Sequence, residues 1–195
     1  SLEFSNATLI RESVYQSDFS SCSKYMPEVS FDLMTNSPIS DISRIDKAII
    51  AKLKLMSKEQ MSCIPDISEG LDNLLYNKVR EATDYSLLLN SLKSKRYTLA
   101  RIRRLVLSAF LDIDNRYFGV QPPYARVLGF RKESFDLKSV EHYKPIITKV
   151  SQVQNLDDFS KEIFNKENQI NEIYSLTLDK PELFKNECTE RLIIK

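Results

Sequence analysis

The sequence has few of the residues that build metal sites, disulfide networks and linkers. It contains three cysteines, Cys22, Cys63 and Cys188, and a single histidine, His142. The cysteines are widely separated and form no Cys-x-x-Cys pair, which excludes a zinc site and a disulfide framework and fits a reducing cytoplasm. With only three glycines and seven prolines, linkers and low-complexity tracts are not expected. The chain should be ordered over most of its length.

Long apolar runs are also lacking. No stretch approaches the roughly 18 residues that a membrane-spanning helix needs, and no charged segment followed by an apolar one opens the chain. We expect neither a secreted nor a membrane protein, but a cytoplasmic one. Because Ser1 reads as the middle of a sequence, we expect a fragment separated from an N-terminal portion. Its 195 residues allow one domain and an appendage, at roughly 150 residues per domain.

Charge is balanced over the whole chain but not along it. The formal net charge is +1, from 28 cationic and 27 acidic residues. Residues 93–104 hold six of the cations and no acidic residue, so the rest of the chain is acidic on balance. Such local charge is typical of a surface that binds a polyanion, and nucleic acid is the leading candidate.

Apolar residues spaced three and four apart predict amphipathic helices. The predicted segments are residues 41–56, 66–82, 85–92, 98–110 and 157–174. Asp66 and Glu69 have the spacing of a capping box for the second helix, and Thr98 can cap the fourth. Short connections imply antiparallel neighbours. Residues 17–40 lack this periodicity and are rich in Ser, Asp and Asn, which predicts an irregular connection.

Two short apolar segments predict β-strands. Residues 124–130 and 145–149 are suited to buried strands, and about residues 134–143 there is room for one short helix between them. The apolar tail at residues 192–194 should dock on the protein. The expected fold is mainly α with a small β element (α+β), in which a helical domain at residues 41–195 includes a short strand-helix-strand unit.

The helix predicted at residues 98–110 determines which cationic side chains of residues 93–104 share a face. Arg101, Arg104 and Ser108 share the face opposite the apolar one, so the two arginines should project together. Arg103 lies nearer to the apolar side, where a guanidinium can snorkel to the edge along its aliphatic stem. Arg103 is therefore a weaker candidate for ligand binding than its two neighbours.

The candidate nucleic-acid contacts are cationic or aromatic. They are Lys93, Lys95, Arg96, Tyr97, Arg101, Arg104 and Arg126. Lysines act as point charges for phosphate, and arginines bind phosphate bidentately or stack on bases. Tyr97 could offer a stacking surface, with plain packing as an equal alternative.

Each of these candidates has a structural alternative. The stretch could be a solvated surface, but its cations lack the acidic i,i+4 partners that such a surface normally has. For Arg126, inside an apolar strand, a structural ion pair is the stronger alternative. His142 has no second histidine or serine elbow beside it, and we interpret it as a surface residue.

Four separated motifs resemble one known family. They are residues 67–73, 93–98 with Arg101 and Arg104, 123–130, and 145–149. In order and spacing they resemble the C-terminal region of the bacterial tRNA(Met) cytidine acetate ligases, over nearly all of the chain. The resemblance implies an enzyme that activates acetate with ATP as acetyl-adenylate, assisted by Mg2+. It would then acetylate N4 of the wobble cytidine of elongator methionine tRNA.

The resemblance also implies how that activity is divided. Such enzymes carry a nucleotidyltransferase-type domain with a His-x-Gly-His motif near the N-terminus, whereas this chain has only His142. We expect residues 1–16 to be the end of that ATP-binding domain and residues 41–195 to bind tRNA. The chain alone should be inactive, with no catalytic residue, no metal ligand and no tightly bound cofactor.

Near the N-terminus, Ser5, Thr8 and Arg11 match a late nucleotide-binding motif of the family. Helix N-terminal amides, hydroxyls and a guanidinium there would receive phosphate oxygens of ATP. Asn6 stands where relatives often carry serine, and Arg103 where they often carry glutamine. Two other functions compete with a ligase: a non-catalytic helical RNA-binding module, and a protein-interaction scaffold whose basic face meets an acidic partner.

Overall fold

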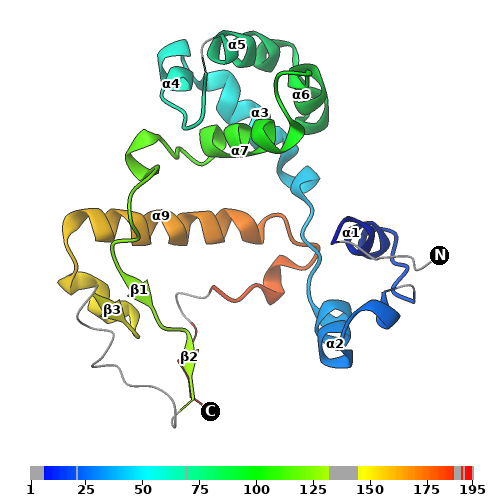
Figure 1. Ribbon diagram of the computed structural model, residues 1–195, viewed down its shortest axis with the longest axis vertical. Helices are drawn as coiled ribbons and strands as arrows, with labels where there is room; N and C mark the ends of the chain where they lie inside the picture. Colours follow the sequence, from blue (N-terminus) through cyan, green and yellow to red (C-terminus); the bar gives the residue numbers. More distant parts are fainter. Residues whose placement is uncertain are drawn as a thin grey trace.

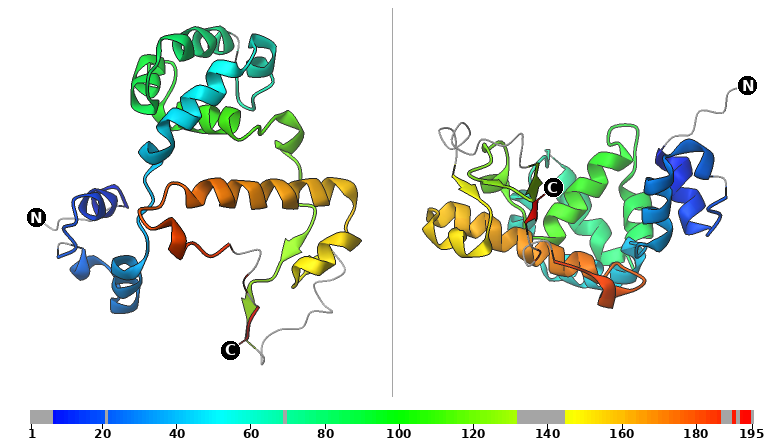
Figure 2. Two further views of the ribbon diagram at one scale, coloured as in Figure 1. Left: turned by 180° about the vertical axis from the view of Figure 1, so that it is seen from behind. Right: turned by 90° about the horizontal axis from the view of Figure 1, so that it is seen from below.

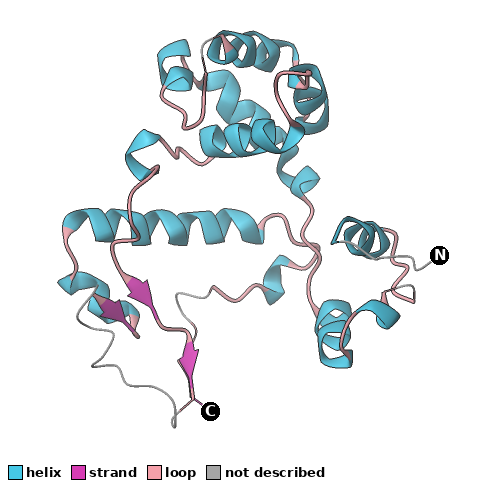
Figure 3. Cartoon of the chain, in the orientation of Figure 1, coloured by secondary structure: helices cyan, strands magenta, loops and turns pink. Residues whose placement is uncertain are grey.

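The computed structural model describes residues 7–20, 22–68, 70–131, 145–186, 190 and 192–194. Helices dominate it and the strands are short (Figure 3), which confirms a fold that is mainly α with a small β element. The α-helices are α1 (Ala7–Tyr15), α2 (Glu28–Asn36), α3 (Asp46–Leu55), α4 (Lys58–Ser62), α5 (Leu71–Glu81), α6 (Tyr85–Leu92), α7 (Leu99–Phe110) and α9 (Asp158–Ser175). The strands are β1 (Ala125–Arg126), β2 (Gly129–Phe130), β3 (Ile146–Ile147) and β4 (Ile193–Ile194).

Helices α3 to α7 pack around one continuous apolar core, and we call them the helical unit (Figure 1). Ile49 of α3, Leu75 of α5, Leu88 of α6 and Val106 of α7 are fully buried in this core. Each lies on the stripe that three- and four-residue spacing predicts. The core therefore fixes α7, whose exposed side carries the cationic residues.

Side-chain caps begin three of the helices, and the sequence predicts the one at Thr98. Asp84 accepts a hydrogen bond of 2.8 Å from the backbone N–H of Leu87 at the start of α6. Thr98 accepts one from Arg101 at the start of α7, and Asp157 accepts one of 2.9 Å from Ser160 at the start of α9. These oxygens satisfy backbone donors that have no partner inside the helix.

The helix predicted from residue 66 starts later than expected. α5 begins after Gly70, whose φ of +84° is left-handed, and Asp66 also has a positive φ, of +63°. The predicted capping box is therefore wrong for Asp66, which lies on the loop between α4 and α5. Helix α4 was not predicted from the sequence. At its start the backbone N–H of Ser57 donates to Gln60 Oε1 and the N–H of Gln60 donates to Ser57 Oγ.

Residues 17–40 are not the irregular connection that we expected. They contain a 3-10 turn at Ser23–Tyr25 and the helix α2, which begins directly after Pro27. Two apolar side chains of α2 remain largely exposed, with Val29 at 71% and Leu33 at 64%. A helix that buries so little apolar surface leaves a weak periodic signal in the sequence. Figures 1 and 2 show α1 and α2 beside the rest of the protein.

The short strands pair in parallel. Ala125 of β1 lies opposite Ile146 of β3, as predicted for the strand-helix-strand unit. The helix expected at residues 134–143 lies outside the described residues, as does His142. β2 pairs in parallel with β4, which confirms that the apolar tail docks. A Cβ on Gly129 would lie 2.9 Å from the carbonyl oxygen of Ile193, so this close pairing requires glycine.

Helix α9 runs between the helical unit and the strands (Figure 1). A second, smaller core joins it to them, formed by Tyr124, Ile147, Val153, Leu156 and Phe164. At its other end, Arg44 donates a hydrogen bond of 2.6 Å to the carbonyl oxygen of Thr177, next to the start of α3. In the described part of the chain, no helix combines the length and apolarity of a membrane span.

Candidate nucleic-acid interface

The turn between α6 and α7 holds the first half of the cationic stretch. The backbone N–H of Lys93 ends α6 by donating to Leu89, and the N–H of Tyr97 donates to Ser94 Oγ at 3.3 Å. The Tyr97 side chain is only 6% exposed and belongs to the core of the helical unit. The turn is therefore anchored from inside, while Lys93 and Lys95 remain exposed on its outer side.

Two guanidinium groups lie over the Tyr97 ring. The central guanidinium carbons of Arg96 and Arg101 lie 5.4 Å and 5.5 Å from the ring centroid, within the range of cation–π attraction. Tyr97 therefore packs in the core and orders two arginines, which is the packing alternative that the sequence left open. The Tyr97 ring is too deeply buried to stack on a base.

Arg101 and Arg104 project together from α7, as predicted, but they do not lack an internal counter-charge. Nη2 of Arg101 donates to the backbone carbonyl of Asp66 at 2.7 Å and lies 3.5 Å from its carboxylate. Nη2 of Arg104 lies 3.2 Å from the other carboxylate oxygen. The contact with Asp66 was not predicted, because Asp66 precedes these arginines by 35 and 38 residues, beyond the reach of any i,i+4 pattern.

The remaining cations of the stretch differ in their surroundings. Among the described residues, Lys93 and Lys95 form no ion pair, so the charge of both ammonium groups faces solvent. Arg103 points elsewhere on α7, near Tyr85. Burial raises the pKa of Tyr85, and the positive charge of Arg103 partly opposes that rise. Arg103 thus stands apart from the Arg101 and Arg104 pair.

Arg126 does not join this group. It lies in β1, on the other side of α9 from α7 (Figure 1), and its side chain is half-buried. Its strand partner is Ile147 of β3. The fold therefore places Arg96, Tyr97, Arg101 and Arg104 together, next to the turn that carries Lys93 and Lys95, and separates Arg126 from them.

The predicted nucleotide-binding residues lie at the start of α1. Thr8 and Arg11 are both exposed, and Nη2 of Arg11 lies 3.4 Å from Thr8 Oγ1, one helical turn away. Ser5 lies outside the described residues. The two described side chains can act on a common anion, but they occupy one short helix rather than an enclosed site.

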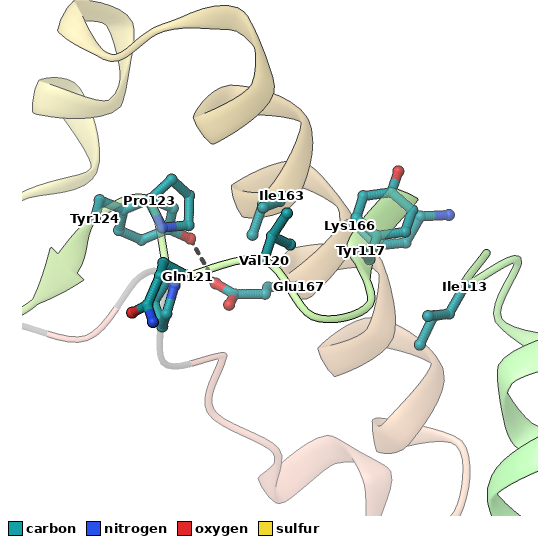
Figure 4. A pocket seen from close by; sticks show the side chains of 10 residues that line it. Ile113, Tyr117, Val120, Gln121, Pro123, Tyr124, Ile163, Lys166 and Glu167 are labelled. Carbon is teal, nitrogen blue, oxygen red and sulfur yellow. Dashed lines mark hydrogen bonds between the residues drawn. The ribbon is translucent and has the colours of Figure 1, made fainter. Parts of the chain in front are cut away.

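A separate pocket lies between α9 and the segment that follows α7 (Figure 4). Its volume is about 290 Å³, and Ile113, Val120 and Ile163 are among its apolar walls. The Tyr124 hydroxyl donates to Glu167 at 2.6 Å, so this polar group at the wall is already paired. The arrangement mainly fastens the segment to α9.

A second tyrosine beside this pocket is held in the same way. The Tyr117 hydroxyl donates to the Glu162 carboxylate. Burial and this carboxylate raise the pKa of Tyr117 to about 12, so the hydroxyl keeps its proton and remains a donor at neutral pH. We assign no acid–base role to it. Among the described residues, no cluster of three or more His, Cys, Asp or Glu side chains could hold a metal ion.

Comparison with known proteins identifies the family. The family model for the HIGH Nucleotidyl Transferases matches residues 1–188. The chain belongs to this family. A tRNA(Met) cytidine acetate ligase of Clostridium acetobutylicum is 34% identical over 169 residues, which cover 82% of this chain and 42% of that relative. One from Thermoanaerobacter sp. (strain X514) is 31% identical over 177 residues, which cover 83% and 43%.

A solved structure agrees with this family assignment at the level of the fold. Thermotoga maritima TmcAL bound with alpha-thio ATP superposes with a TM-score of 0.86 at 20% identity, over 100% of this chain and 53% of that one. The resemblance to tRNA(Met) cytidine acetate ligases read from the four motifs is thus confirmed. The chain spans less than half the length of these two curated relatives.

Proposed function

We propose that this chain binds tRNA through the cationic surface formed by Lys93, Lys95, Arg96, Arg101 and Arg104, as part of an ATP-dependent tRNA(Met) cytidine acetate ligase. The observation that carries the proposal is that Arg96 and Arg101 share the Tyr97 ring and Arg101 and Arg104 share Asp66, beside a turn on which Lys93 and Lys95 are exposed. Such a surface attracts the phosphate backbone of RNA.

The position of the cations on α7 supports an external anion. Arg104 lies in the second turn of α7 and Arg101 in the first, where the helix dipole already contributes positive charge. Cations are disfavoured there unless an anion is near. The Asp66 carboxylate offsets only part of this charge, because Lys93 and Lys95 form no ion pair among the described residues.

The chemical setting of the proposal comes from the relatives. The ligase would activate acetate with ATP and transfer the acetyl group to N4 of the wobble cytidine of elongator methionine tRNA. In this chain, Thr8 and Arg11 would contact nucleotide phosphates at the start of α1. We assign no Mg2+ site to the described residues, because they hold no cluster of metal-binding side chains.

Charge reversal on the turn tests the proposal. The variant K93E/K95E should bind elongator methionine tRNA at least about tenfold more weakly than the wild type, because each lysine neutralises about one phosphate. The slope of log affinity against log salt should fall by about two. Filter binding across a salt series measures both. The control K180E/K185E makes the same charge change at two exposed lysines outside the cationic surface.

Equal losses in the two double variants would show that net charge, not this surface, governs binding. Strong binding of an acidic protein with none of tRNA would favour the scaffold function instead. If tRNA binds, the reaction is then assayed with the complete ligase of which we propose this chain to be a part, because the chain alone is expected to be inactive. Formation of N4-acetylcytidine from ATP and acetate by that protein separates a ligase from a non-catalytic RNA-binding module. Loss of that product in K93E/K95E, at concentrations where the wild type is unsaturated, would connect the surface to the reaction.

A further inference from the structure

Among the described residues, Asp66 is the acidic residue that contacts the cationic surface. Its φ of +63° is rare for a residue other than glycine. This conformation accompanies an unusual arrangement, in which the backbone carbonyl and the carboxylate of one residue both reach α7. The carbonyl contacts Arg101, and the carboxylate lies near both Arg101 and Arg104.

The backbone carbonyl of Asp66 holds Arg101. Its hydrogen bond from Nη2 is 2.7 Å long, and the Arg101 side chain is only 27% exposed. The ring of Tyr97 lies under the same guanidinium. Nε of Arg101 is buried without a hydrogen-bond partner. Arg101 is thus fixed by contacts that do not involve the carboxylate and still has an unmet donor.

The carboxylate of Asp66 is held less closely. Its oxygens lie 3.5 Å from Nη2 of Arg101 and 3.2 Å from Nη2 of Arg104. Both distances are longer than those of a strong charge-assisted hydrogen bond, which are roughly 2.7–2.9 Å. The Arg104 side chain is 68% exposed, so solvent and ligands reach it. The carboxylate therefore lies between two guanidinium groups without forming a tight pair with either.

Phosphate and carboxylate present similar oxygens to guanidinium groups, and arginine binds both in the same forked geometry. We propose that in the free protein the Asp66 carboxylate occupies the place of an RNA phosphate between Arg101 and Arg104, and that bound RNA displaces it. This inference rests on the proposed function. Asp66 would then set specificity, because an RNA that makes few other contacts gains too little to displace the carboxylate.

Removing the carboxylate should strengthen RNA binding. Asp66→Gly suits the positive φ and keeps the carbonyl that holds Arg101, and Asp66→Asn keeps the size of the side chain. We expect both variants to bind elongator methionine tRNA about two- to fivefold more tightly at fixed salt, since an exposed ion pair resists displacement only modestly. Affinity for an unstructured RNA of equal length should rise by a larger factor.

A matched control and a double variant isolate the contact. Glu81→Ala removes another exposed, ion-paired carboxylate of the helical unit, one paired with Lys78 at 2.8 Å, and should leave tRNA affinity within about twofold. In an Arg104→Ala background, Asp66→Gly should lose most of its effect, because the displaced contact is already absent. Thermal unfolding of each variant confirms that the fold is kept.

Weaker tRNA binding by both Asp66 variants would overturn the inference and assign the carboxylate to positioning Arg104. Unchanged binding would overturn it as well. A titration with inorganic phosphate, followed by NMR of the arginine side-chain N–H groups, decides the matter without tRNA. Asp66→Gly should shift the Arg104 signal at several-fold lower phosphate than the wild type. If the Arg104 signal shifts at the same phosphate concentration in both proteins, displacement of the carboxylate is refuted even if tRNA binds. If tRNA does not bind, only the proposed function is refuted.

Discussion

The helical unit and the region around α9 are built on cores of very different size. Among the described residues, twenty buried side chains form the core of the helical unit, whereas five form the core that joins α9 to β1 and β3. The cationic surface lies on the larger core, and Arg126 lies beside the smaller one. A surface that must hold several charges close together against their repulsion needs rigid support, and the helical unit provides it.

The same substitution in the two cores tests this difference. Leu75→Ala should cost about 3–5 kcal/mol in the free energy of unfolding, because the fully buried site cannot collapse around the cavity. Leu156→Ala should cost nearer to 2 kcal/mol, because the smaller core can relax toward solvent. Denaturant unfolding measures both, with the exposed Leu87→Ala as a control that should change little. Equal losses in the free energy of unfolding for Leu75→Ala and Leu156→Ala would show that the two cores do not differ in rigidity.

Residue patterns predicted the helical unit better than the segments around it. The apolar stripes of α6 and α7 and the cap Thr98 are local signals, and they have the roles that the sequence predicts. The contact of Asp66 with α7 could not be read in this way, because loop closure over 35 residues leaves no periodic signal. Positive φ at Asp66 and Gly70 likewise decided where α5 begins.

The N-terminal segment and the strands show a second limit. α2 leaves Val29 and Leu33 exposed, so burial does not impose an amphipathic pattern on it. β1 and β2 are each two residues long, and their partners come from distant parts of the chain. The apolar run at 124–130 indicated strand but not that it divides between two partners. Tyr97 shows the same ambiguity in a side chain, since a tyrosine among cations suits both stacking and packing.

A smaller effect should appear at the start of α9. Hydrogen bonds from the Ser160 hydroxyl and backbone N–H lower the pKa of Asp157 below 3.8. The folded state therefore favours the charged carboxylate, and its contribution to stability is present above about pH 4 and is lost as pH falls through the lowered pKa. Asp157→Asn should make unfolding less sensitive to acid between about pH 5 and 2.

The control for this pH series is Asp158→Asn, one residue further into α9. Its carboxylate is fully exposed and lies 3.6 Å from Lys161, without the hydrogen bonds that Asp157 receives. Acid titration of the unfolding midpoint compares the three proteins. If Asp158→Asn flattens the curve as much as Asp157→Asn does, general repulsion among carboxylates, and not the cap, accounts for the acid sensitivity.

The smallest effect should come from Arg126. Arg126→Glu should weaken tRNA binding less than Arg104→Glu does in the same filter-binding assay, because β1, which carries Arg126, lies across α9 from α7. A phosphate bound there would lie outside the cationic surface. A loss from Arg126→Glu as large as that from Arg104→Glu would extend the interface across α9, so that both cores would carry the RNA.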